Sequence, residues 1–120
     1  MPKESETQAR IFAWAAVMRG KYPGLDLMYH VPNGGSRNKI EAANLKRQGV
    51  KAGVPDICLP VPRGGYHGLY IELKEGRNKA TEKQLEWIAE LARQGYVAVV
   101  CTGFDAAVQE IVRYLEGKDV

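Results

Sequence analysis

The stretch GVPDICLPVPRGGYHGLYIELKEG, residues 53–76, decides the fold, because two apolar runs in it flank a segment rich in proline and glycine. Apolar runs rich in β-branched and aromatic residues and bounded by turn formers are typical of β-strands. Two such runs joined by a short segment that contains glycine favour a β-hairpin. The sequence therefore predicts a hairpin that turns near residues 62–65.

The register of this hairpin gathers charged residues on one of its faces. If the turn centres on Gly64, the apolar residues face one another across the strands, and the pairs are Ile57 with Ile71 and Leu59 with Leu69. The other face then carries Asp56 opposite Glu72, with Lys74 two residues further along the same strand. A shift of one residue would break both the apolar pairing and the charged cluster.

Two carboxylates and a lysine held together suit one kind of chemistry. The acids repel each other unless a cation lies between them. A few hard oxygen ligands with room for water favour Mg²⁺ or Mn²⁺, which can bind a phosphate oxygen and lower the pKa of a bound water. A lysine beside them can stabilise charge in the transition state. The cluster favours phosphodiester hydrolysis; the alternative is a turn aspartate near a surface glutamate–lysine pair.

Spacing and capping signals predict the remaining elements. Helices are expected over residues 4–20, 38–48, 82–94 and 105–116, and strands over residues 25–31 and 96–101. The third helix is expected to bury a stripe formed by Leu85, Ile88, Leu91 and Ala92. The strand YVAVVC is continuously apolar, which predicts burial on both faces. Its link to the hairpin through a helix predicts a right-handed parallel crossover, and the whole an α/β domain spanning residues 1–120, with a mixed sheet flanked by helices.

The first predicted helix carries polar residues on its buried side. Its apolar stripe follows steps of three and four residues through Ile11, Ala15 and Met18. Continued toward the N-terminus, the stripe passes through Gln8 and Glu4, which should therefore face the protein. Glu6 lies about 200° round the helix from Glu4. It remains the alternative acid, because the register of a short helix can slip.

Composition limits the class of protein. The hydrophobic fraction of 45% is enough for a core, and no apolar run reaches the roughly 20 residues that a membrane span needs. The charged N-terminus does not resemble a secretory signal, so we expect an intracellular, cytoplasmic protein of a bacterium or a phage-infected cell. Two cysteines without a CxxC pair predict free thiols, and with only two histidines a zinc site is not expected.

Basic residues cluster before the hairpin. The net charge of +3 is too mild to identify a nucleic-acid-binding protein. Residues 37–51, however, carry five basic side chains and one acid, and the basic ones are Arg37, Lys39, Lys46, Arg47 and Lys51. They are candidates for contacts with DNA phosphates, which would make binding fall with salt. The alternative is an ordinary solvated helix face.

Several stretches, in this order along the chain, resemble a stand-alone VRR-NUC domain, the virus-type replication-repair nuclease of the PD-(D/E)xK superfamily. They are ESETQ (4–8), PNGG (32–35), GVKAGVPDI (49–57), YIELK (70–74), TEKQLEW (81–87) and GYVAVVCTGFDAA (95–107). The resemblance covers nearly the whole chain. It implies a restriction-endonuclease-like core and a DNA endonuclease that depends on Mg²⁺ or Mn²⁺.

The resemblance also implies roles for single residues. Asp56 and Glu72 match the metal-binding acids, Lys74 the catalytic lysine, and the main-chain carbonyl of Leu73 a further ligand. Glu4 matches the N-terminal acid, which would bind the metal directly or through water. The remaining matches are Gln8, one helical turn after that acid, and Gln84, a glutamine near the site.

Three further assignments stay open. Gln84 has the spacing of a capping box with Thr81, so it can cap its helix as well as approach the site. His30 and Asn33 flank the Gly34–Gly35 loop and could contact a phosphate or a metal-bound water. A histidine at a strand end is more often a hydrogen-bonded structural residue, and His30 is interpreted mainly in that way.

These observations predict an endodeoxyribonuclease that hydrolyses phosphodiester bonds by attack of a metal-activated water. Stand-alone proteins of this kind are small phage or bacterial proteins, and we expect a homodimer that cuts branched DNA such as Holliday junctions, with a role in DNA repair. The main alternative is a DNA-binding module that has kept the fold and lost catalysis. A sequence-specific restriction enzyme is less favoured, because 120 residues leave no added recognition region.

Overall fold

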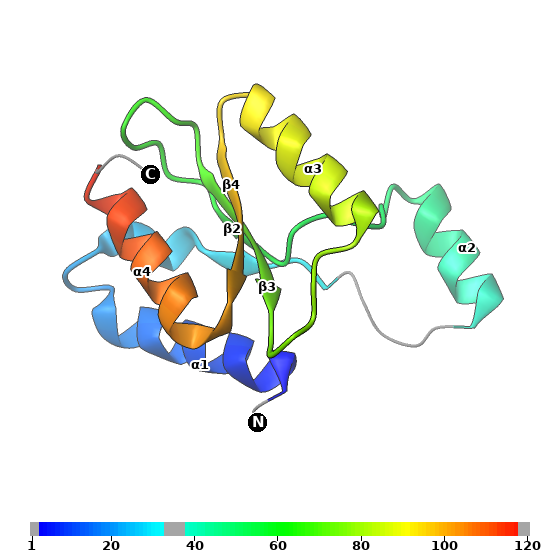
Figure 1. The fold of residues 1–120 in the computed structure, drawn as a ribbon, viewed down its shortest axis with the longest axis horizontal. Coiled ribbons are helices and arrows are strands. Elements are labelled where there is room, and N and C mark those ends of the chain that lie inside the picture. The colour runs from blue at the N-terminus through cyan, green and yellow to red at the C-terminus, as the bar shows by residue number, and fades with distance from the viewer. Residues whose placement is uncertain (1–2, 33–37, 118–120) are drawn as a thin grey trace.

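The computed structural model describes residues 3–32 and 38–117 as a four-stranded sheet with helices around it (Figure 1). In chain order the elements are α1 (Glu4–Met18), a 3₁₀ helix (Pro23–Leu27), β1 (Tyr29–His30), α2 (Lys39–Arg47), β2 (Ile57–Leu59), β3 (Leu69–Lys74), α3 (Glu82–Arg93), β4 (Val97–Thr102) and α4 (Gly103–Leu115). Among the helices of these described residues, none is both long and apolar enough to cross a membrane.

The sheet is mixed, as predicted. Its strand order is β1-β2-β3-β4; β1 and β2 are antiparallel, β2 and β3 are antiparallel, and β3 and β4 are parallel. The predicted hairpin register is confirmed, with Ile57 opposite Ile71 and Leu59 opposite Leu69. Because α3 connects β3 to the parallel β4, the predicted crossover is confirmed too.

The hairpin turns at its expected place, through two glycines. Arg63 and Tyr66 exchange backbone hydrogen bonds of 3.1 and 2.8 Å across the tip. Gly64 and Gly65 both have positive φ, at 57° and 86°, which a two-residue turn of this hand requires at both central positions. The pairing of Arg63 with Tyr66 at the tip is one residue out of step with the pairing of Ile57 with Ile71 in β2 and β3. The apolar pairs of the strands, and not the tip alone, therefore determine the register of the charged face.

The core lies between the sheet and one layer of helices. Figure 1 shows α1 and α4 against one side of the sheet and α3 on the other. The residues that fill the core and are at most 1% exposed include Ile11, Ile57, Leu59, Leu69, Ile71, Leu73 and Ile111. They come from α1, the hairpin and α4. The end of the sheet that carries Lys74 is therefore anchored by well-packed neighbours.

The other side of the sheet is less covered than the sequence suggested. The predicted buried stripe of α3 is wrong, because no residue of α3 is buried and Leu85 is 51% exposed. The prediction that β4 is buried on both faces is also wrong. β4 is an edge strand whose Val97 and Cys101 are buried while Val100 is 37% exposed. In the part of the chain that the structure describes, α3 thus shields this face only partly.

The predicted strand over residues 25–31 is mostly wrong. Pro23 and Gly24 begin a 3₁₀ helix instead, since proline has the fixed φ of a first helical turn. Met28 closes that turn with a 3.1 Å hydrogen bond from its backbone N to the carbonyl oxygen of Leu25. The 3₁₀ helix buries Leu25 and leaves only Tyr29 and His30 to form the short β1.

The helix α2 stands apart from the sheet (Figure 1). Asn38 caps it by accepting a 2.7 Å hydrogen bond from the backbone N of Glu41. None of its nine residues is buried, and Ile40 is 77% exposed. Local capping and helix propensity thus hold α2 together, with little help from packing.

Candidate active site

The hairpin places Asp56 beside the end of β3. Asp56 lies just before β2, and its Oδ2 accepts a 2.8 Å hydrogen bond from the backbone N of Leu73. That residue lies between Glu72 and Lys74 on β3. The hydrogen bond therefore directs the Asp56 carboxylate across the hairpin toward the two charged side chains of the opposite strand.

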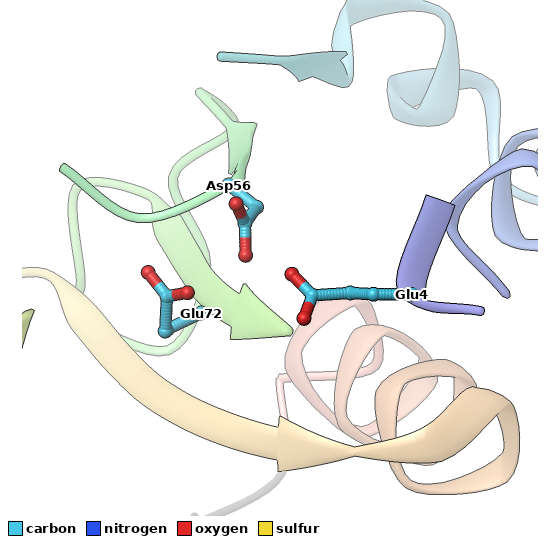
Figure 2. Close-up of side chains that lie close together, drawn as sticks. All are labelled: Glu4, Asp56 and Glu72. Atoms are coloured by element: carbon cyan, nitrogen blue, oxygen red, sulfur yellow. The ribbon is translucent and has the colours of Figure 1, made fainter. Parts of the chain in front are cut away.

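Three carboxylates from separate parts of the chain converge at this point (Figure 2). One oxygen each from Glu4, Asp56 and Glu72 lies within 4.8 Å of the others. Glu4 arrives from the first turn of α1, as the helical stripe predicted. Glu6, the alternative acid, is exposed and is not a member of this cluster.

One oxygen of the buried acid in this cluster has no hydrogen-bond partner among the described residues. This acid is Glu72, which is 1% exposed, and the oxygen is its Oε1. Burial raises the pKa of Glu72 to about 8, and the hydrogen bond and charge of Asp56 add to this. Burial and then Asp56 also raise the pKa of Glu4. Three carboxylate donors, one of them buried with an oxygen that accepts no hydrogen bond from the described residues, fit a hard divalent cation such as Mg²⁺ or Mn²⁺.

Lys74 places a positive charge against the buried acid. Its side chain is on the same face of β3 as Glu72, and its Nζ lies 3.6 Å from Glu72 Oε2. The residue is only 9% exposed. Its charge lowers the pKa of Glu72, but burial and Asp56 together outweigh it. The ammonium thus lies where it can reach a group bound at the carboxylates.

A contact that the sequence did not reveal fastens α1 to the site. Thr7 is 1% exposed, and its Oγ1 donates a 2.6 Å hydrogen bond to Oε2 of Glu75. Glu75 directly follows Lys74, and its charge contributes to the raised pKa of Glu4. Because Thr7 lies one turn after Glu4 on α1, the hydrogen bond sets how far Glu4 reaches toward the cluster. Thr7 and Glu75 are 68 positions apart, so no local sequence pattern indicates this hydrogen bond.

His30 supports the backbone of Asp56. Its Nδ1 lies 2.9 Å from the carbonyl oxygen of Asp56, which also accepts a 2.7 Å hydrogen bond from the backbone N of Val31. A carbonyl oxygen only accepts, so Nδ1 carries the proton in this contact. The contact agrees with the structural interpretation of His30.

The other predicted site residues lie in varied places. Gln84 completes the predicted capping box, with 2.8 and 3.2 Å hydrogen bonds exchanged with Thr81. Gln8 is half-buried on α1, one turn beyond Glu4. Asn33 and Arg37 lie outside the described residues. The remaining predicted DNA contacts are exposed on or just after α2, and they are Lys39, Lys46, Arg47 and Lys51.

The comparisons with known proteins agree with this fold. The model of the VRR-NUC domain family matches residues 3–105. A solved structure described as a VRR_NUC domain protein is 40% identical to the chain, with a TM-score of 0.84, and the match covers 99% of this chain and 93% of that one. No curated protein gives a significant match.

The fold and the cluster of acids define a domain of the nuclease class. The chain belongs to the VRR-NUC family, and its function is that of a nuclease domain that processes DNA.

Proposed function

We propose that this chain is a divalent-metal-dependent endonuclease that hydrolyses phosphodiester bonds of DNA. The observation that carries the proposal is the convergence of the Glu4, Asp56 and Glu72 carboxylates beside the Lys74 ammonium. Repelling acids are costly to hold together without a cation. Three separate parts of the chain bring these acids together, which favours a functional role for the cluster over a contribution to stability.

Asp56 and Glu72 are proposed to hold the ion, Mg²⁺ or Mn²⁺, together with the main-chain carbonyl of Leu73. Glu4 contributes a further oxygen, directly or through water. When bound, the ion would offset phosphate charge and make an attacking water more acidic. The unpaired Oε1 of Glu72 supports this assignment, since a buried carboxylate oxygen without a partner is unfavourable unless something binds it.

Lys74 is proposed to act on the reacting phosphate. Its ammonium can donate a hydrogen bond to a phosphate oxygen and stabilise the negative charge that grows as water attacks phosphorus and an ester P–O bond breaks. Glu72, 3.6 Å away, holds the ammonium in place. Gln84, Gln8 and His30 are assigned supporting parts, and the hydrogen bond from His30 to Asp56 fits such a part.

The preferred substrate is proposed to be branched DNA such as a Holliday junction, cut by a homodimer. Two copies related by a two-fold axis would present two sites, one for each strand to be cut. The exposed basic residues of the projecting α2 support a wide contact with DNA, and they are Lys39, Lys46 and Arg47.

The test compares a labelled four-way junction with a linear duplex of the same sequence, in Mn²⁺, Mg²⁺ or EDTA. We expect paired nicks in the junction that need the metal and disappear in Lys74→Ala. Lys21→Ala, which removes an exposed lysine outside the site, is the matched control and should cut normally. Equal cutting of both DNAs would refute branch selectivity. Metal-independent binding without cleavage would leave a silent DNA-binding module.

A further inference from the structure

A groove lies between α2 and α3, away from the acids. Its main hollow has a volume of about 680 Å³. Residues from α2, from α3 and from the chain between α2 and β2 line it, among them Leu45, Lys46, Val50, Lys51, Lys83 and Trp87. We call this feature the α2–α3 groove. A volume of this size is typical of a site for a small organic group.

One wall of the groove is firmly built. Trp87 Nε1 donates a 3.0 Å hydrogen bond to the carbonyl oxygen of Ala52, which fixes the indole against the chain before β2. Gly53, with φ of +90°, lets α3 approach closely, because a Cβ there would lie 2.7 Å from Lys83 Cγ and 2.9 Å from Trp87 Cδ1. Trp87 is therefore held in place at the groove, and Lys83 lies close to the chain before β2.

The lining combines apolar side chains with positive charge. Leu45, Val50 and Trp87 supply apolar surface, and three lysines are spread around it. The described residues that line the groove include no acid. Phosphates of DNA would meet the lysines, and bases would meet the apolar surface. Only unpaired bases can do so, since the faces of paired bases are stacked inside a duplex.

The groove leads toward the acids. A second hollow of about 300 Å³ shares Val50, Lys51 and Trp87 with the first, and it is also lined by Val31 and Val54. The backbone N of Val31 donates to the carbonyl oxygen of Asp56 at 2.7 Å. The two hollows thus run from α2 to the backbone that carries one of the three carboxylates.

We propose that the α2–α3 groove binds an unpaired strand of DNA, with Lys46, Lys51 and Lys83 on its phosphates and Trp87 against a base. The proposal rests on the proposed function, because it assigns a binding site to bases that unpair at the branch point of the substrate, next to the cutting site. It explains why α2 stands apart from the core with its residues exposed. It also explains why Trp87, a large aromatic residue, is only partly buried on α3.

The first experiment measures binding in EDTA, so that cleavage plays no part. A fluorescent oligo-dT of 15 nucleotides (about the upper end of single-strand site sizes) is titrated into the wild type and into Lys46→Ala/Lys51→Ala/Lys83→Ala. The matched control changes exposed basic residues elsewhere to alanine, namely Lys21, Arg93 and Arg113. We expect at least about tenfold weaker binding for the groove variant relative to the control, and a salt slope reduced by about 2. Equal losses would overturn the proposal.

The second experiment observes Trp87 directly. The chain has two tryptophans, so Trp14→Phe leaves Trp87 as the only source of indole emission. We expect oligo-dT to quench this emission in a saturable way, and Trp87→Leu to weaken binding about tenfold. If Trp14→Phe does not fold, the difference between the wild type and Trp87→Phe gives the same signal. Binding with unchanged Trp87 emission would contradict the proposal.

Other outcomes separate this proposal from the proposed function. Quenching of Trp87 in a protein that cleaves nothing would keep the groove and refute the nuclease mechanism. Cleavage without quenching of Trp87 would support the nuclease mechanism and refute the role of the groove. If Leu45→Glu dissociates a dimer in sedimentation while oligo-dT binding survives, the groove is an interface between two copies, and the proposal is overturned.

Discussion

The acid cluster and the α2–α3 groove differ in how they are built. The cluster lies on well-packed elements, with Glu72 1% exposed and Lys74 9% exposed. The groove lies between two helices that bury none of their residues. Like charges are crowded in the first region, whereas cations in the second face solvent. In the proposed function, the chemistry that needs fixed distances is therefore assigned to the sheet, and contact with DNA of variable shape is assigned to the exposed helices.

Loss of Lys74 should distinguish the roles of the acid cluster and the α2–α3 groove most sharply. Lys74→Ala is expected to lower the rate of cleavage at least about 100-fold, because it removes the group that we propose stabilises transition-state charge. Binding of DNA in EDTA should stay near that of the wild type, since the groove is untouched. Single-turnover cleavage and binding titrations check both parts. A parallel loss of binding would contradict the division of roles.

The hydrogen bond between Thr7 and Glu75 should matter for the acid cluster alone. Thr7→Val is expected to weaken Mn²⁺ binding about tenfold, because loss of a contact behind metal ligands loosens them. Thr7→Ser keeps the hydroxyl and should restore most of the affinity. Titration calorimetry with Mn²⁺ measures both. If valine and serine behave alike, the hydroxyl does not position Glu4.

The crowding of acids should make the metal-free protein sensitive to pH. The folded pKa of Glu72 is about 8, against an ordinary value of 4.5, so the folded state holds the extra proton between these values. The stability that comes from this bound proton is therefore fully present below pH 4.5 and is lost as the pH rises from 4.5 to about 8. We expect thermal unfolding in EDTA to show higher stability at pH 5 than at pH 8.

Glu72→Gln is the matched variant for this pH dependence. It cannot lose a proton, so its stability should vary less over the same window and exceed that of the wild type at pH 8 by about 0.5–2 kcal/mol. Mn²⁺ should stabilise the wild type at pH 8 and the variant much less. Equal pH profiles of the two proteins would show that Glu72 is not crowded.

The smallest effect is expected in α2. Ile40→Ser should change the free energy of unfolding by less than about 0.5 kcal/mol, because Ile40 is 77% exposed. Ile71→Ala, in the core, should cost about 2–5 kcal/mol and is the comparison. Denaturant unfolding gives both values. A large loss for Ile40→Ser would mean that α2 packs against a partner, such as a second copy.

The sequence predicted the hairpin well because its signals are local. Alternation of apolar residues determines the register, and the register places Asp56 near Glu72. The helical stripe likewise placed Glu4 on the correct side. The prediction of a strand over residues 25–31 was mostly wrong because Pro23 and Gly24 favour a helical turn.

Long-range features left less trace in the sequence. The partner of Thr7 depends on where α1 docks, which no local pattern states. The amphipathic pattern of α3 predicted burial, yet Leu85 is 51% exposed and no residue of α3 is buried within the described part of the chain. The groove depends on residues from α2, α3 and the segment between α2 and β2 meeting in space. Such features require the fold before they can be recognised.

Calorimetric titration of Mn²⁺ into the wild type and into Asp56→Asn tests most directly whether the three carboxylates form a cation site. We expect saturable binding by the wild type and at least tenfold weaker binding by the variant, with Glu6→Gln unchanged because Glu6 lies outside the cluster. Binding that survives Asp56→Asn, or no binding by the wild type, would contradict the claim that the carboxylates form this site.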